Sequence, residues 1–282
     1  MFGLSQQRKT LPNPQGDGAP ALKPSSEELA EMGFLEHLEE LRWRIIRGFI
    51  GIIAGIGICM FFYRWVIDVI LLGPADPDFF MYHFLGLDLK DFVLQNRTVT
   101  GQFSAAVGTV AAVGLIIGAP VFIYQMWAFV EPGLYSHEKS RIRFVSLFAT
   151  TFFMLGVSFG YLIITPFALN FFAGFELSER ISNEFDITKY FGLITLWSFG
   201  VGLLFELPVV VYFLSKLGLV TPHLLRKSRR YAIVGILVLA ALITPPDPFS
   251  QLLTAMPLQL LYEASILISA AAERKRERAL AA

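Results

Sequence analysis

The chain has 282 residues, of which 55% are hydrophobic and only 16% are charged, and its formal net charge at pH 7 is +0. Together with a mean hydropathy of +0.58, this composition argues against a water-soluble globular domain and is typical of lipid-facing helices. The zero net charge conceals a strong asymmetry, because lysine and arginine are concentrated in particular loops.

The N-terminal part of the chain divides into a tail and a helix. Residues 1–24 are rich in proline, glycine and polar residues and have no apolar run beside a small-residue cleavage site. We therefore expect a disordered cytoplasmic tail, not a signal peptide that is removed. Residues 25–44 are predicted to form an amphipathic cytoplasmic helix, because Ser25 and Glu28 fit a capping box and apolar residues recur every three positions.

The polar face of this helix carries three carboxylates, Glu36, Glu39 and Glu40. Another acidic residue, Glu138, lies in a short polar connection further along the chain. The ordinary interpretation of these carboxylates is local ion pairing, for example of Glu40 with Arg44 four residues away. From spacing alone, that interpretation and a functional one both remain open.

Six apolar stretches follow the amphipathic helix. Hydrocarbon cannot hydrogen-bond the backbone, so a spanning helix needs roughly 20 mainly apolar residues. The stretches comprise residues 45–65, 103–130, 144–172, 190–217, 231–243 and 251–271. Because the last two are short, we predict an all-α membrane protein whose six transmembrane helices (residues 45–271) form a concave bundle with two short C-terminal helices.

Lysine and arginine gather in alternate loops between these stretches. They precede the first stretch, separate the second from the third and the fourth from the fifth, and follow the sixth as a basic cytoplasmic tail, residues 272–282. By the positive-inside rule, we expect both termini to lie in the cytoplasm.

Two acidic residues interrupt the apolar stretches. Glu206 stands in the fourth stretch, two residues before Pro208, and an ionisable group at that depth is a candidate functional residue by default. The alternative is a protonated or hydrogen-bonded core residue. Glu263 in the sixth stretch raises the same question, and there we favour a structural role.

Signatures of enzymes are mostly absent. The sequence has no phosphate-binding G-x-x-x-x-G-K-[ST] loop, its four histidines lie outside the apolar stretches, and Cys59 is the only cysteine. We therefore expect no catalytic activity, no metal site, no cofactor and no disulfide.

Four segments form a set that resembles the TatC family, the multi-spanning receptor component of the twin-arginine protein translocase. The resemblance extends from about residue 34 to residue 271, with the motifs in the expected order and spacing. The segments are residues 37–44 (HLEELRWR), 124–138 (YQMWAFVEPGLYSHE), 205–208 (FELP) and 244–251 (TPPDPFSQ).

This resemblance implies a receptor for signal peptides that carry paired arginines. In the family, the acidic residues that match Glu40 and Glu138 form the site for the arginine pair, the aromatic that matches Phe129 lies beside them, and the arginine that matches Arg42 supports the region. The chemistry is reasonable, because a guanidinium group presents a planar fork of donors to a carboxylate, whereas lysine makes weaker point contacts.

The resemblance also implies a second site and several partners. Glu206 and Gln251 are expected to form an intramembrane polar cluster near the place where single-span partners of the TatA and TatB type dock, with Leu242 on an apolar helix face and Pro246 and Asp247 in a periplasmic turn. Export of folded proteins would be driven by the proton-motive force, in the bacterial cytoplasmic (inner) membrane. We expect self-association within the lipid bilayer and no nucleic-acid partner.

A secondary transporter and a passive scaffold are the two alternative functions. A secondary transporter would place Glu206 in an ion pathway but predicts an internal repeat, and we find no convincing one. A passive scaffold would bind no peptide motif.

The first outer loop, residues 73–102, departs from the family pattern, and its aromatic cluster is interpreted either as an interfacial belt or as a short membrane-surface helix.

Overall fold

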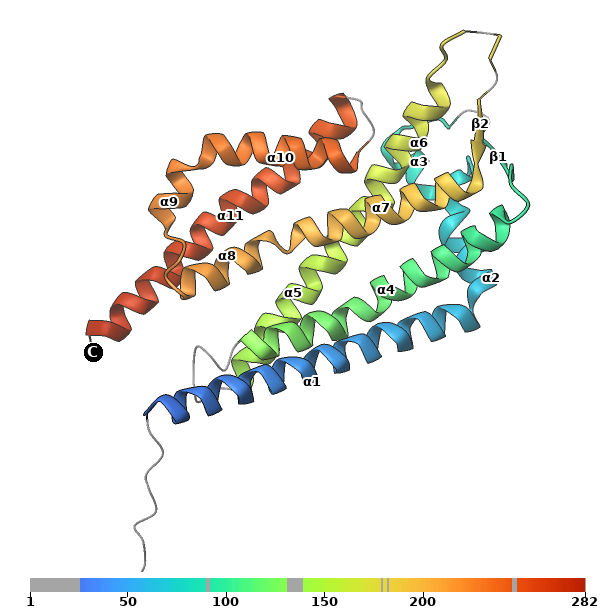
Figure 1. Ribbon diagram of the computed structural model, residues 1–282. Helices are drawn as coiled ribbons and strands as arrows, with labels where there is room; N and C mark the ends of the chain where they lie inside the picture. Colours follow the sequence, from blue (N-terminus) through green and yellow to red (C-terminus); the bar gives the residue numbers. More distant parts are fainter. Residues whose placement is uncertain are drawn as a thin grey trace, which may run out of the picture. The chain divides into compact units, whose positions relative to one another are not determined.

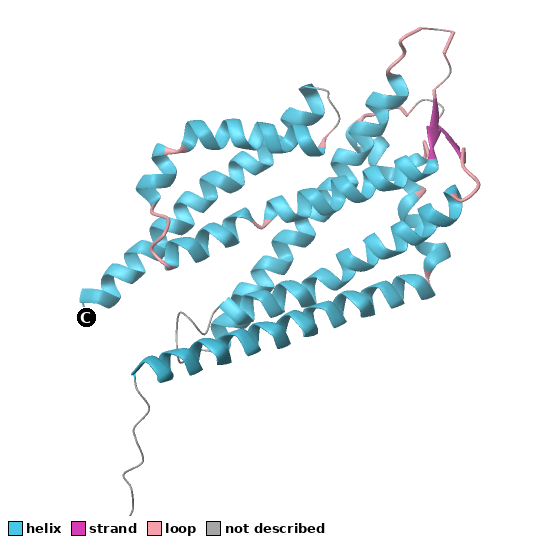
Figure 2. Cartoon of the chain, in the orientation of Figure 1, coloured by secondary structure: helices cyan, strands magenta, loops and turns pink. Residues whose placement is uncertain are grey.

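The computed structural model describes residues 26–89, 92–130, 139–178, 180–181, 183–244 and 248–281. The chain divides into two compact units, Met1–Leu41 and Arg42–Ala282, and each is considered by itself. Figures 1 and 2 show the helices and the two strands. In chain order the elements are α1 (Ser26–Phe61), α2 (Tyr63–Trp65), η1 (Val66–Leu71), η2 (Gly73–Ala75), α3 (Phe80–Leu85), β1 (Val93–Gln95), α4 (Gly101–Val130), α5 (Lys139–Phe159), η3 (Gly160–Ile164), α6 (Thr165–Gly174), β2 (Glu184–Asp186), α7 (Ile187–Phe205), α8 (Leu207–Lys216), α9 (Pro222–Lys227), α10 (Arg229–Ile243) and α11 (Pro248–Ala281).

In the described part of the chain, five helical runs are long and apolar enough to cross a membrane. They are Glu36–Phe61, Gly101–Phe129, Phe144–Gly174, Ile187–Lys216 and Pro248–Arg274. The predicted fifth stretch is a helix, α10, but it has only 15 residues. The helix of the sixth stretch, α11, has 34 residues.

The prediction of two short C-terminal helices is therefore wrong for the second of them. Residues 270–281 contain no glycine or proline and consist mainly of alanine, glutamate, arginine and lysine, which are strong helix formers. The helix consequently continues past the end of the apolar stretch. Only α10 is short.

Two of the long runs contain breaks at prolines. Pro166 has no N–H group for the carbonyl of Leu162, and the chain there forms the π-helical turn η3, in which the Thr165 hydroxyl donates to the Gly160 carbonyl at 3.0 Å. In the fourth run, Pro208 follows a break at Glu206, which separates α7 from α8. Proline thus interrupts the helical hydrogen bonding of both runs without ending the span.

The strongest helix contacts of the second unit join α5 to α7 and α8 to α11, and α4 packs against both α5 and α7. Glycines bring α1 and α4 into close contact: a Cβ atom added to Gly118 would lie 2.5 Å from the Ile52 Cα atom, and one added to Gly51 would lie 2.6 Å from the Val121 Cβ atom. Close approach of this kind is the usual role of Gly-x-x-x-Gly spacing in membrane helices. Gly51 and Gly55 follow this spacing, and both lie against α4.

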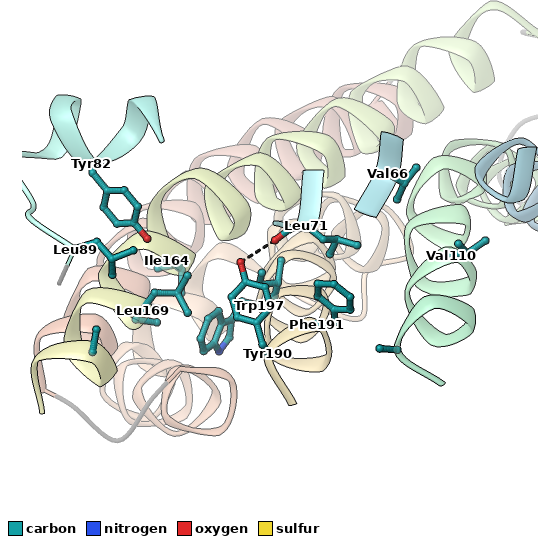
Figure 3. Close-up of a cluster of buried hydrophobic side chains, with 14 of the residues drawn as sticks. Val66, Leu71, Tyr82, Leu89, Val110, Ile164, Leu169, Tyr190, Phe191 and Trp197 are labelled. Atoms are coloured by element: carbon teal, nitrogen blue, oxygen red, sulfur yellow. Dashed lines mark hydrogen bonds between the residues drawn. The ribbon is translucent and has the colours of Figure 1, made fainter. Parts of the chain in front are cut away.

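The largest buried cluster gathers near η1 and the N-terminal part of α7 (Figure 3). Tyrosine hydroxyls bond backbone carbonyls that η1 and η2 leave without helical partners. Tyr190 donates to Leu71 at 2.7 Å, Tyr161 to Ile70 at 2.5 Å, and Tyr82 to Pro74 at 2.6 Å. Buried carbonyls must find such partners where water is absent. These bonds fix the segment that follows the first spanning helix.

The fold is mainly α-helical, as predicted, but it also contains one small pair of strands that the sequence did not predict. Val93–Gln95 pairs in parallel with Glu184–Asp186 (Figure 2), and the rings of Phe92 and Phe185 stack beside this pair with centroids 4.2 Å apart. An ion pair of 3.2 Å between Arg97 and Glu184 joins the same two loops. Strands of three residues are too short to show an alternating pattern, which is why the sequence did not predict them.

Candidate functional site

The carboxylate predicted to bind arginine, Glu40, belongs to the first unit. Its side chain is half-buried, whereas those of Glu36 and Glu39 are exposed. All three lie on α1, which continues without interruption from the predicted amphipathic segment into the first spanning run. Residues 26–44 therefore lie within one helix, and Ser25 lies outside the described residues.

The other predicted members of this site belong to the second unit or lie outside the described residues. Arg42 is exposed, and Phe129 is half-buried at the penultimate position of α4. One turn earlier than the helix end, Trp127 packs edge-on against Phe213 of α8, with ring centroids 5.8 Å apart. Glu138 lies outside the described residues. The convergence of Glu40 and Glu138 on one ligand accordingly stays a prediction.

Glu206 occupies the break between α7 and α8. Its N–H donates to the Leu203 carbonyl at 3.1 Å, and its carbonyl accepts from Val209 and Val210, each at 3.0 Å. Its side chain does not cap α8, and both carboxylate oxygens are buried without a hydrogen-bond partner among the described residues. A buried charge is stable only when it is paired or hydrogen-bonded. This carboxyl group is therefore available to a partner that supplies a donor.

Gln251, which was expected to join Glu206, has a different partner. Its side-chain nitrogen donates to the Leu237 carbonyl at 3.1 Å, which links α11 to α10. The expected cluster therefore contains no hydrogen bond between Glu206 and Gln251. The turn residues Pro246 and Asp247, between these two helices, lie outside the described residues.

Leu242 lies on an exposed apolar face of α10. Its side chain is 73% exposed, and Val234 and Val238, at positions eight and four residues earlier, are 60% and 54% exposed. Residues four apart share one face of a helix. The short helix α10 thus presents a continuous row of apolar side chains that no described part of the chain covers.

The structure also settles the role of Glu263. Its carboxylate pairs with Arg229 at 2.6 Å, and the neighbouring Tyr262 hydroxyl donates to the Leu225 carbonyl at 2.8 Å. These contacts connect α11 to α10 and α9. These contacts support the structural interpretation of Glu263. Glu206 differs, because its carboxylate has no partner within the described part of the chain.

Several buried polar groups have no counterpart in the sequence analysis. The hydroxyls of Ser146, Ser198 and Thr254 are buried without a partner in the described structure. Serine and threonine recur throughout the apolar stretches, so no sequence signal distinguishes these positions. No group of three or more histidine, cysteine, aspartate or glutamate side chains gathers among the described residues in a way that could hold a metal ion.

Residues 36–257 match the family model described as "Sec-independent protein translocase protein (TatC)". The chain belongs to the TatC family. A TatC from Blattabacterium sp. subsp. Periplaneta americana is 36% identical over 263 residues, covering 88% of this chain and 99% of that protein. TatCy from Bacillus subtilis is 34% identical, covering 89% of this chain and 94% of that protein. TatC from Aquifex aeolicus is 35% identical, covering 87% of this chain and 98% of that protein.

Solved structures of the TatC family are similar over most of the fold. A crystal structure titled as the twin-arginine translocase receptor TatC has a TM-score of 0.68 and 35% sequence identity, covering 84% of this chain and 99% of that chain. A second crystal structure of that receptor, in DDM, gives the same TM-score and identity, covering 83% and 99%. The chain is thus a multi-pass membrane protein of the Sec-independent protein translocase family, whose members are transport proteins.

Proposed function

We propose that this protein is the receptor subunit that binds signal peptides with paired arginines and, with TatA- and TatB-type partners, supports export of folded proteins. The observation that carries the proposal is the family match over residues 36–257, together with the 35% identity to a solved twin-arginine translocase receptor. The match includes both Glu40 and Glu138. The proton-motive force drives export by the assembled complex.

The proposed peptide site uses the carboxylates of Glu40 and Glu138, with Phe129 and Arg42 beside them. A half-buried carboxylate such as that of Glu40 interacts more strongly with a guanidinium group than a fully exposed one, because water screens it less. Two carboxylates acting together select two adjacent arginines over two lysines, since only arginine offers a bidentate fork of donors.

Photocrosslinking tests this proposal directly. A photoreactive amino acid is placed at Glu40 or at Glu138, and labelling of a signal peptide with Arg-Arg is compared with labelling of the same peptide with Lys-Lys. A probe at Glu39, which is exposed on the same helix, serves as the matched control. We expect labelling from Glu40 and Glu138 to depend on the arginines. Equal labelling by both peptides from these positions rejects the receptor function.

We also propose that Glu206, Gln251 and Leu242 form the docking region for single-span partners. The carboxyl group of Glu206, which has no hydrogen-bond partner among the described residues, and the exposed apolar row on α10 support this proposal. A partner helix would cover the row and offer a donor to the carboxyl group. Glu206→Ala and Leu242→Asp are expected to reduce co-purification of the TatA- and TatB-type partners. Unchanged co-purification by both variants, with peptide binding as the control, excludes this docking region.

The proposed location is the bacterial cytoplasmic membrane, with six crossings and both termini in the cytoplasm. In this arrangement α10 is a short span, and its 15 residues cover roughly 20 Å of a hydrocarbon layer about 30 Å thick. Bilayer thinning or neighbouring protein compensates for such a mismatch. Self-association of receptor subunits is part of the same proposal.

A further inference from the structure

The short helix α3 (Phe80–Leu85) exposes aromatic side chains and buries its other face. Met81 and Tyr82 are 7% and 1% exposed, whereas Phe80 and Phe84 are 60% and 81% exposed. Phe80 and Phe84 are four residues apart and therefore lie on one side of the helix. Two phenylalanines exposed together on a fixed helix require an explanation, because water would not favour them.

The direction of this aromatic face is fixed by the contacts of α3. Tyr82 donates to the Pro74 carbonyl at 2.6 Å, and the ring of Phe79 packs edge-on against that of Tyr161, with centroids 6.1 Å apart. Gly86, with φ of 65°, ends the helix, and the N–H of Leu87 returns to the Tyr82 carbonyl at 2.9 Å. This is a Schellman motif, which only a residue that tolerates positive φ allows at low energy. The exposure of Phe80 and Phe84 is thus a fixed feature of the fold.

Contacts also indicate the depth of α3 along the third spanning run. Tyr161 meets Phe79 just before α3, and the Asn170 side chain donates to the Asp88 carbonyl just after it, at 2.9 Å. Both partners belong to the apolar run Phe144–Gly174. This run has 31 residues, or roughly 45 Å of helix, which exceeds a hydrocarbon thickness of about 30 Å. The α3 helix therefore lies beside the part of the run that passes from hydrocarbon into the headgroup layer.

We propose that α3 is an interfacial anchor whose Phe80 and Phe84 side chains insert into the bilayer. They enter the leaflet on the side of the β1–β2 pair, at the boundary between acyl chains and headgroups. Aromatic side chains concentrate at this boundary. The inference requires only that the run Phe144–Gly174 crosses the membrane, and it is independent of which peptide the protein binds.

The residues around α3 indicate that lipid covers its aromatic face. Further aromatic side chains are exposed at the end of the first spanning run and at the start of α4. The aromatic face of α3 therefore adds to a group of exposed aromatic residues on the same side of the membrane. These residues are Phe61 (82%), Phe62 (54%), Trp65 (56%) and Phe103 (74%). The loop before α3 exposes Asp76 and Asp78, which would repel anionic headgroups. Anchoring therefore depends on aromatic burial and not on lipid charge.

Spin-label accessibility measures this insertion. Cys59, the single cysteine, is 2% exposed and is replaced by alanine, and a nitroxide is attached at Phe84→Cys in protein reconstituted into phosphatidylcholine nanodiscs. Leu177→Cys, in the loop after α6 and 82% exposed, is the water-side control. Leu155→Cys, 54% exposed on α5, is the control within the hydrocarbon. Phe80→Cys reports on the same face of α3 if the variant at Phe84 does not fold.

The expected result is that the label on α3 collides with a water-soluble nickel complex several-fold less often than the label at Leu177, and with oxygen more often. Its ratio of oxygen to nickel accessibility should fall between those of Leu177 and Leu155. Adding anionic lipid should not raise this ratio, because Asp76 and Asp78 repel anionic headgroups. Nickel accessibility equal to that at Leu177, at either Phe84 or Phe80, overturns the proposal.

Discussion

At the scale of single residues, two carboxylates of the apolar stretches differ in a way that stability measurements can detect. Glu206 is buried without a partner among the described residues, whereas Glu263 pairs with Arg229 at 2.6 Å. A buried polar group without a hydrogen bond costs roughly 1–3 kcal/mol. An exposed ion pair, in contrast, stabilises by about 0–1 kcal/mol.

We therefore expect Glu206→Met to raise the unfolding temperature of the purified protein, by removing a penalty of about 1–3 kcal/mol. Methionine fills similar space and needs no hydrogen-bond partner. Glu263→Met is the matched control and should leave the unfolding temperature unchanged or lower it slightly. Thermal unfolding in detergent decides the matter, and a lower unfolding temperature for Glu206→Met than for Glu263→Met would contradict this account of Glu206.

The same residue shows what sequence can establish about the site. Glu206 was predicted because a charge in an apolar stretch is visible in the sequence. Packing between helices decides that this carboxyl group has no partner in the described structure and that Gln251 bonds the Leu237 carbonyl. No sequence pattern encodes such a choice of partner.

At the scale of helices, the sequence predicted the spans better than their ends and interruptions. Hydropathy placed all the long helices because twenty apolar residues leave few alternatives. It did not predict that α11 continues to Ala281, since the cue for this is helix propensity after the apolar residues end. It also missed β1 and β2, whose pairing joins loops distant in the sequence.

Glycine substitutions test the contact between α1 and α4. A Cβ atom at Gly118 would lie 2.5 Å from the Ile52 Cα atom, whereas one at Gly57 would meet nothing within 4 Å. Because backbone atoms cannot move aside cheaply, we expect Gly118→Ala to destabilise the protein by about 1–3 kcal/mol. Gly57→Ala should stabilise it by roughly 0.5–1 kcal/mol, through the helix propensity of alanine.

Unfolding of both variants by sodium dodecyl sulfate, followed by helical circular dichroism, measures these effects. The opposite signs provide the control, since any general effect of alanine would shift both variants alike. Equal midpoints for Gly118→Ala and wild type would mean that the two helices are not in the close contact described.

At the scale of the whole molecule, the short helix α10 decides the topology. If α10 crosses the membrane, there are six crossings and the termini share one side; if it does not, there are five and the termini lie on opposite sides. Five crossings would leave the basic residues 274–278 across the membrane from the basic residues before the first span. This violates the positive-inside rule, so we expect six crossings.

Thiol labelling of intact cells tests the topology. In a Cys59→Ala background, Ser5→Cys and Ala282→Cys should both resist a membrane-impermeant reagent, while Leu177→Cys should react. Reaction of Ala282→Cys without reaction of Ser5→Cys would establish five crossings.

Peptide binding directly tests whether Glu40 and Glu138 recognise paired arginines. Affinities of a signal peptide with Arg-Arg and of its Lys-Lys counterpart are measured for wild-type protein and for Glu40→Gln and Glu138→Gln in nanodiscs. Charge-assisted hydrogen bonds contribute about 1.5–3 kcal/mol, so wild type should prefer Arg-Arg by roughly tenfold or more. Each variant should lose most of this preference. Equal affinities of wild type for the two peptides would contradict the claim.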